Sequence, residues 1–123
     1  MNAICLILGA VAMPLAGDGF TLDWTHSVER IRWHEEWQAA PGGLRLTAAA
    51  VQGSGAGMEP GAGARRVDGG WHWVPDLPVV PELVLAASGA TGAGWTLCDG
   101  ATCREVGAEA GAPVILRPCD HSP

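Results

Sequence analysis

The sequence predicts an all-β domain, a small antiparallel β-sandwich or barrel of about seven or eight short strands. Three observations lead to this fold class. The 123 residues include 18 Gly and 9 Pro, both of which disfavour the interior of helices. Several segments alternate apolar with polar side chains, which is the period of a strand with one buried face. Hydrophobic residues make up 48% and charged residues 16%, a balance typical of a packed domain.

Residues 1–16 resemble a signal peptide. The apolar run Ala3–Leu8 precedes Ala10-Val11-Ala12, a small-x-small sequence of the kind that signal peptidase accepts. We therefore expect a periplasmic or otherwise extracytoplasmic protein with one mature all-β domain over residues 17–123. A membrane-spanning helix needs about 20 apolar residues. Because Gly17-Asp18-Gly19 interrupts the run, we expect no stable membrane insertion of the mature chain.

The charge balance excludes one class of partner. Seven basic residues, none of them Lys, stand against 13 carboxylates, and the net charge is -6. Such a surface repels phosphate backbones, so nucleic acid is not expected as a partner.

Two alternating segments, Phe20–Ser27 and Arg30–Gln38, predict a β-hairpin with one apolar and one polar face. If the turn is formed by residues 27–30, the register follows. The facing pairs on the apolar side are then Phe20 with Trp37, Leu22 with Glu35, Trp24 with Trp33, and His26 with Ile31. On the polar side Asp23 faces His34 and Thr25 faces Arg32. A helix remains an alternative for the second segment, because Trp33, Trp37 and Ala40 have i, i+4, i+7 spacing.

The rest of the chain continues as short strands. Leu44–Val51 predicts a third strand, with Leu44, Leu46, Ala48 and Ala50 on one face. Residues 53–63 are too rich in glycine for a regular element and predict a long surface loop. Further strands are expected at Trp71–Val74, Leu83–Ala87, Trp95–Cys98, Cys103–Val106 and Val114–Arg117.

The cysteines predict one disulfide. Loss of Cys5 with the signal peptide would leave three cysteines, of which Cys98 and Cys103 flank a turn-rich tetrapeptide. Strands that meet at such a turn bring the two Cα atoms within disulfide range, so we expect this pair to be bonded and Cys119 to be left over. A zinc site formed by these three cysteines and His121 is an alternative. Oxidation in an exported protein disfavours it, so no metal and no cofactor are expected.

The predicted turn after the first strand carries candidate binding residues. His26, Ser27 and Glu29 could converge on a ligand or partner at the strand end. They could equally shape the turn through local hydrogen bonds. A Ser–His catalytic pair is not expected, because neighbouring side chains on a strand point to opposite faces.

Glu35 interrupts the apolar face beside Trp33, and we include both residues among the candidates. A lone ionised carboxylate is costly to bury, so Glu35 must be paired, neutral or solvated. A structural ion pair with Arg45 or Arg32 is one explanation. A carboxylate that faces a ligand is the other.

The glycine-rich loop contributes Gly55, Gly57 and Met58 to the candidates. It lacks the Lys-Ser/Thr that ends a phosphate-binding loop, so nucleotide binding is not expected. Its glycines could let Met58 pack onto the sheet, or the loop could cover a pocket. In Trp71-His72-Trp73 the indoles could enter the core or stack on a sugar or partner.

Three stretches together carry a family resemblance. They are Thr25–Glu29 with Trp33, Gly53–Met58, and Trp95–Cys98 with Cys103. The chain resembles an uncharacterised bacterial family, a domain of unknown function, whose short exported members are often encoded beside TRAP-type transporters of the TAXI class. This resemblance implies export and an accessory role near a solute transporter, with the TRAP membrane or solute-binding subunits as partners.

The leading functional hypothesis is therefore a non-enzymatic accessory or binding module outside the cytoplasm. The alternative is a small hydrolase or metal-dependent enzyme that uses His26, Glu29 and Glu35.

Overall fold

The computed structural model describes residues 4–25, 32–52, 64–67, 70–85, 94–100, 102–108 and 111–119, and this part of the chain is built of strands without a helix. The eleven strands are β1 (Ile4–Leu8), β2 (Val11–Pro14), β3 (Gly19–Thr25), β4 (Arg32–Ala40), β5 (Gly43–Gln52), β6 (Arg65–Val67), β7 (Gly70–Trp73), β8 (Leu83–Leu85), β9 (Trp95–Cys98), β10 (Cys103–Val106) and β11 (Val114–Pro118). The all-β class is confirmed. The expected strand number was too low, because β1, β2 and β6 were not recognised as strands.

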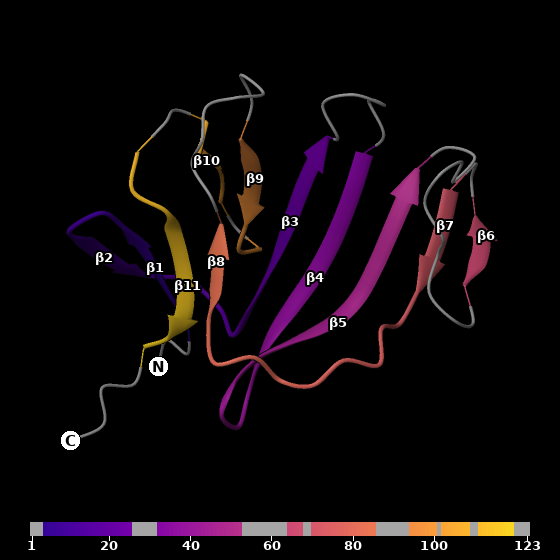
Figure 1. The fold of residues 1–123 in the computed structure, drawn as a ribbon, viewed down its shortest axis with the longest axis horizontal. Coiled ribbons are helices and arrows are strands. Elements are labelled where there is room, and N and C mark those ends of the chain that lie inside the picture. Colours follow the sequence, from indigo (N-terminus) through magenta and orange to yellow (C-terminus); the bar gives the residue numbers. More distant parts are fainter. Residues whose placement is uncertain are drawn as a thin grey trace.

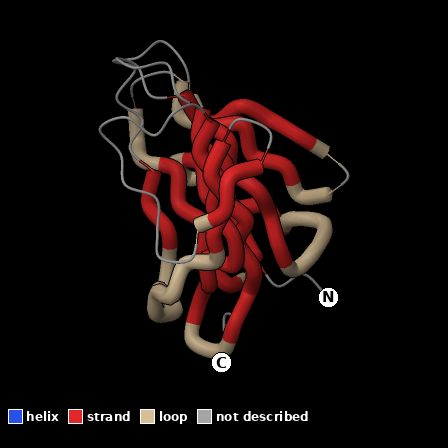
Figure 2. The backbone as a smooth tube through the Cα atoms, turned by 90° about the vertical axis from the view of Figure 1, so that its right-hand side faces the viewer, coloured by secondary structure: helices blue, strands red, loops and turns tan. Residues whose placement is uncertain are grey.

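The strands form two antiparallel sheets. The small sheet has the order β2-β1-β11-β8, and the large sheet has the order β10-β9-β3-β4-β5-β7-β6. Figure 1 shows the small sheet at one side of the molecule and the large sheet extending away from it through β4 and β5 to β7 and β6. The side view in Figure 2 shows strands throughout the described chain. The two sheets pack together as a small β-sandwich.

The core lies between the small sheet and the β10, β9, β3 side of the large sheet. Ile4, Leu6 and Leu116 of the small sheet and Leu22 of the large sheet are fully buried, with 0% exposure. The same cluster includes Leu97 of β9. Because side chains alternate along a strand, the neighbours of these residues point out of the sandwich, and this alternation gives the large sheet its polar outer face.

The predicted β3–β4 hairpin register is confirmed for the described residues. Phe20 pairs with Trp37, Leu22 with Glu35, Trp24 with Trp33, Asp23 with His34, and Thr25 with Arg32. The helical alternative for the second segment is wrong, because it forms the nine-residue strand β4. Aromatic stacking between β3 and β4 stabilises the strand conformation. The ring centroids lie 6.3 Å apart for Phe20–Trp37 and 5.6 Å apart for Trp24–Trp33.

A β-bulge changes which side chains of β5 face the core. The register with β4 shifts between Glu36 and Trp37, so that Thr47 is the extra residue on β5. Its hydroxyl donates a hydrogen bond of 3.0 Å to the backbone oxygen of Glu36. The predicted common face of Leu44, Leu46, Ala48 and Ala50 is therefore wrong beyond the bulge, where Ala49 and Val51 are the buried residues.

The segment predicted as a signal peptide takes part in the fold. Strand β1 pairs with β11 on one side and β2 on the other, and Cys5 is bonded to Cys119. The expectation that Cys119 is left over is therefore wrong, because all four cysteines are in disulfides. An apolar run with small residues after it satisfies the requirements of a core strand as well as those of a signal peptide. Cleavage within residues 1–16 stays a prediction, and it would remove β1 from the sheet.

Candidate functional site

Polar residues gather in two rows across the outer face of the large sheet. The first row places Asp23 of β3 opposite His34 of β4, His34 opposite Ala50 of β5, and Ala50 opposite His72 of β7. In the second row, Gln52 of β5 lies opposite Gly70 of β7. Arg32 and Gln52 are the chain neighbours of the paired residues Trp33 and Val51, and both line the same pocket. Chain segments more than forty residues apart in sequence thus contribute to one surface.

These rows enclose a pocket of about 290 Å³. The side chains that line it are Asp23, Arg32, His34, Ala50, Gln52 and His72. Strands β4 and β7 are two strand spacings apart, about 10 Å, and only the methyl group of Ala50 stands between His34 and His72 in that row. Gly70 has no side chain to fill the base of the pocket. A Cβ atom at this position would lie 2.6 Å from the backbone oxygen of Val51.

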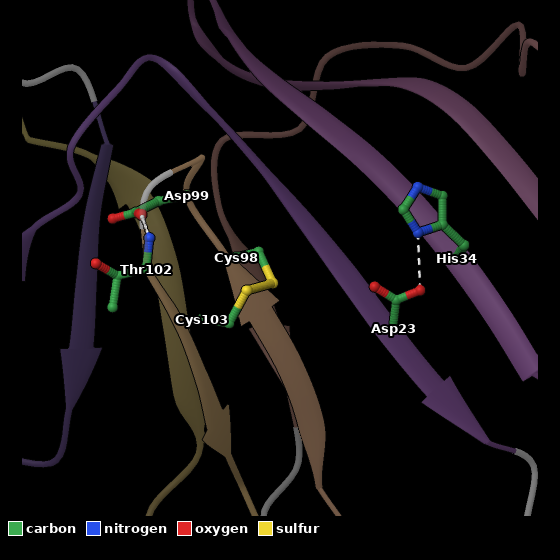
Figure 3. Close-up of a disulfide and its surroundings, with 6 residues drawn as sticks. All are labelled: Asp23, His34, Cys98, Asp99, Thr102 and Cys103. Carbon is green, nitrogen blue, oxygen red and sulfur yellow. Dashed lines mark hydrogen bonds and ion pairs between the residues drawn. A yellow bond between two sulfur atoms is a disulfide. The ribbon is translucent and has the colours of Figure 1, made fainter.

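His34 is held between two carboxylates at one side of the pocket. Its Nδ1 lies 2.8 Å from Asp23 Oδ1, and its Nε2 lies 3.1 Å from Glu36 Oε2. Figure 3 shows the Asp23 carboxylate and the His34 ring pointing toward each other from adjacent strands. Burial by itself lowers the pKa of His34, but the hydrogen bonds and the charges of Asp23 and Glu36 outweigh it and raise the pKa above 6.5.

We expect this histidine to make stability depend on pH. Since the pKa of His34 is higher in the folded state than in the unfolded state, protonated His34 stabilises the fold fully below about pH 6.5. This contribution is lost as the pH rises through the folded-state pKa. Urea unfolding at about pH 5.5 and about pH 8.5 should therefore show a larger stability loss for the wild type than for the His34→Gln variant. Equal losses in the two proteins would contradict the assignment.

The described residues of the pocket form a polar surface that can bind a ligand. Both ring nitrogens of His34 are already engaged by carboxylates. Among the described residues that line the pocket there is no Ser, Thr or Cys that an imidazole could activate. What the pocket does present is a guanidinium, an amide and a second imidazole, from Arg32, Gln52 and His72.

Glu35 lies on the opposite, inner face of the sheet. Its Oε1 accepts a hydrogen bond of 3.0 Å from the indole Nε1 of Trp37, two residues along the same strand. Of the explanations considered for Glu35, the ion pair with Arg45 or Arg32 is replaced by a hydrogen bond from an indole. Residues i and i+2 of a strand share one face, whereas Arg32 lies on the other. Glu35 does not line the pocket described above.

Trp33 also belongs to the inner face. It stacks on Trp24 and meets Trp73 edge-on, with 6.2 Å between the ring centroids. Trp73 thus turns inward while its neighbour His72 is exposed on the outer face. Among the predicted site residues, Trp33 and Glu35 are close to each other but are separated from the pocket by the sheet itself.

The predicted Cys98–Cys103 disulfide is confirmed. The two residues face each other across the β9–β10 hairpin, with a Cα–Cα distance of 4.1 Å. Asp99 Oδ1 accepts a hydrogen bond of 3.1 Å from the backbone N–H of Thr102, which closes the turn beside the disulfide (Figure 3).

A depression of about 490 Å³ beside this turn is lined in part by Asp18, Glu36 and Asp99. Glu36 contacts His34, and Asp99 also accepts a hydrogen bond from the backbone N–H of Ala16. These two carboxylates therefore already have structural roles.

Six predicted site residues lie outside the described residues, and their placement stays a prediction. They are His26, Ser27, Glu29, Gly55, Gly57 and Met58. Conversely, sequence reasoning did not identify the pocket residues Arg32, Gln52 and His72 as a site. The paired polar face of the hairpin was a signal for Arg32, Asp23 and His34. The approach of Gln52 and His72 depends on the β5–β7 pairing, for which no local pattern was available.

Fold and site together define a small disulfide-bonded β-sandwich with a polar pocket on the outer face of its larger sheet. The sequence matches a family described as a domain of unknown function, DUF1850, over residues 20–106, and the chain belongs to this family. The match contains the seven strands of the large sheet except Gly19, the first residue of β3, and it contains all the residues that line the pocket. Neither the curated proteins nor the solved structures gave a significant match. The link to TAXI-class transporters stays a prediction.

The described residues also bear on two other kinds of site. In these parts of the chain, no group of three or more His, Cys, Asp and Glu side chains is arranged to hold a metal ion. No helix there has the length and apolar character needed to cross a membrane.

Proposed function

We propose that this protein is a non-enzymatic binding module that acts outside the cytoplasm and holds a small polar ligand in its outer-face pocket. The observation that carries this proposal is the convergence of Asp23, Arg32, His34, Gln52 and His72 on one pocket. These side chains stand on four adjacent strands of one sheet, a scaffold that keeps a binding geometry with little loss of conformational freedom.

The disulfides support a location outside the cytoplasm. Cys5–Cys119 joins β1 to the residue that follows β11, and Cys98–Cys103 joins β9 to β10 of the large sheet. Disulfides persist in the periplasm and in secreted proteins, whereas cytosolic thiols are kept reduced. A chain with all four cysteines bonded is therefore suited to an oxidising compartment.

The proposed partner is the membrane or solute-binding subunit of a TAXI-class TRAP transporter. Membership of the DUF1850 family is consistent with this role but does not define it. A module that binds a solute near such a transporter would present the ligand to it or sense its concentration.

Affinity purification of the tagged full-length protein from its native membrane fraction tests the partner. We expect the transporter subunits to co-purify, and the purified components to bind with a dissociation constant in the micromolar range or below. Absence of binding between purified components at micromolar concentration would overturn the transporter role. The Arg117→Gln variant is a suitable control. It carries its substitution in β11 of the small sheet and leaves the pocket intact.

A further inference from the structure

We infer that the ligand of the outer-face pocket is a small carboxylate, with Arg32 as the residue that recognises its charge. This inference rests on the proposed binding function and adds the chemical class of the ligand. It depends on which polar groups of the pocket are already engaged and which are left to bind.

The acidic groups of the pocket region are engaged by His34. Asp23 contacts one ring nitrogen and Glu36 the other, at 2.8 Å and 3.1 Å. An imidazolium donates a hydrogen bond through each nitrogen, so this arrangement satisfies His34 and partly neutralises both carboxylates. The acidic side of the pocket is therefore a poor site for a cationic ligand.

The basic groups are left to bind a ligand. Among the described residues, the ion pairs are those of His34, and no carboxylate is paired with Arg32. The Arg32 guanidinium offers several N–H donors in a planar arrangement that matches the two oxygens of a carboxylate. Gln52 lines the same pocket as Arg32 and adds an amide donor. His72 can add a ring N–H from the next row.

A further positive charge lies at the edge of the same row. Arg65 of β6 is the register partner of His72 and is exposed. At a pH at which His34 is protonated, Arg32, Arg65 and His34 carry three positive charges against the two negative charges of Asp23 and Glu36. This is a local excess of positive charge on a chain whose net charge is -6. It favours the approach of an anion to this face.

The pocket also limits the size of the ligand. Its volume of about 290 Å³ is at the lower end of the range for small-molecule sites. Its floor, formed by the Ala50 methyl group and the bare backbone of Gly70, can accept a short apolar body. A carboxylate head near Arg32 and Gln52 with a short chain over Ala50 fits these constraints.

Titrations of the isotope-labelled, disulfide-bonded full-length protein followed by NMR test the inference. The probes are pyruvate, succinate and glutamate as carboxylates, with glucose, putrescine and inorganic phosphate as a neutral polyol, an amine and a non-carboxylate anion. We expect saturable shifts of the backbone amides of Ala50, Gln52 and Gly70 with at least one carboxylate, and weaker or no shifts with the other three compounds.

Two matched variants test whether Arg32 recognises the charge of the ligand. Arg32→Gln should weaken carboxylate binding about 10- to 100-fold, because a hydrogen bond to a charged group contributes about 1.5–3 kcal/mol. Arg45→Gln removes the same charge from β5 at the residue opposite Gln38, outside the pocket, and should leave binding unchanged. Unchanged unfolding midpoints would show that both variants are folded.

The outcomes separate the inference from the proposed function. Saturable binding of glucose, putrescine or phosphate in the pocket, without carboxylate binding, would overturn the carboxylate inference and leave the binding function standing. Equal weakening by Arg32→Gln and Arg45→Gln would overturn the assigned role of Arg32. If none of the six compounds shifts the pocket amides, the carboxylate inference fails, whereas the partner experiment above still tests the proposed function.

Discussion

Removal of residues 1–16 should unfold the domain. The deletion takes away β1, an interior strand of the small sheet, together with the buried side chains of Ile4, Leu6 and Leu15. Truncating one such side chain to Ala costs about 2–5 kcal/mol. The three losses together are comparable with the total stability of a typical domain, about 5–15 kcal/mol. We expect the truncated chain to lose its cooperative urea transition and its dispersed amide spectrum.

Two substitutions in the same segment give a graded form of this test. Leu6→Ala, at a fully buried position, should lower the free energy of unfolding by about 2–5 kcal/mol. Val11→Ala, at a position that is 57% exposed, should change it by less than about 0.5 kcal/mol. If a chain that begins at Gly17 unfolds with the wild-type midpoint and urea dependence, β1 is dispensable and residues 1–16 can be a cleaved signal peptide. The mass of the protein purified from its native compartment would show which form is present.

The two disulfides should differ strongly in their contribution to stability. Cys5–Cys119 spans 114 residues, and Cys98–Cys103 spans 5. A longer closed loop removes more entropy from the unfolded chain. We therefore expect the paired substitution Cys5→Ala with Cys119→Ala to cost about 5 kcal/mol, and Cys98→Ala with Cys103→Ala to cost about 2 kcal/mol. Urea unfolding monitored by tryptophan fluorescence would measure both values.

Each double variant serves as the control for the other, because each loses two thiols and one bond. A shorter route to the same comparison is selective reduction followed by mass mapping of the free thiols. Similar costs for the two pairs would contradict the loop-length explanation. They would indicate instead that native packing around the sulfurs, for example at the buried Cys119, determines their contribution.

The hairpin of β3 and β4 could be predicted residue by residue. Its alternation places Phe20, Leu22 and Trp24 on one face and Asp23 on the other, so a slip of one residue would move the large apolar side chains into water. The same register predicted the Asp23–His34 contact on the polar face. Strong alternation on both strands is thus enough to position local neighbours.

The bulge in β5 could not be predicted in this way. Leu44, Leu46, Ala48 and Ala50 alternate without interruption in the sequence, and alanine fits either face. The insertion of Thr47 opposite β4 reverses the facing of the residues that follow. This reversal turns Ala50 toward the pocket floor, where a larger side chain would fill the space between His34 and His72.

By itself the sequence determined the all-β class, the β3–β4 register, the Cys98–Cys103 bond and the polar character of the face that carries the pocket, because each of these depends on neighbours close in the chain. The tertiary structure alone decided that Ile4–Leu8 forms a core strand, that Cys5 meets Cys119, and that Gln52 and His72 join Asp23 and His34. These contacts link distant segments. The free energy of such pairings comes from shared burial, which no local pattern of residues encodes.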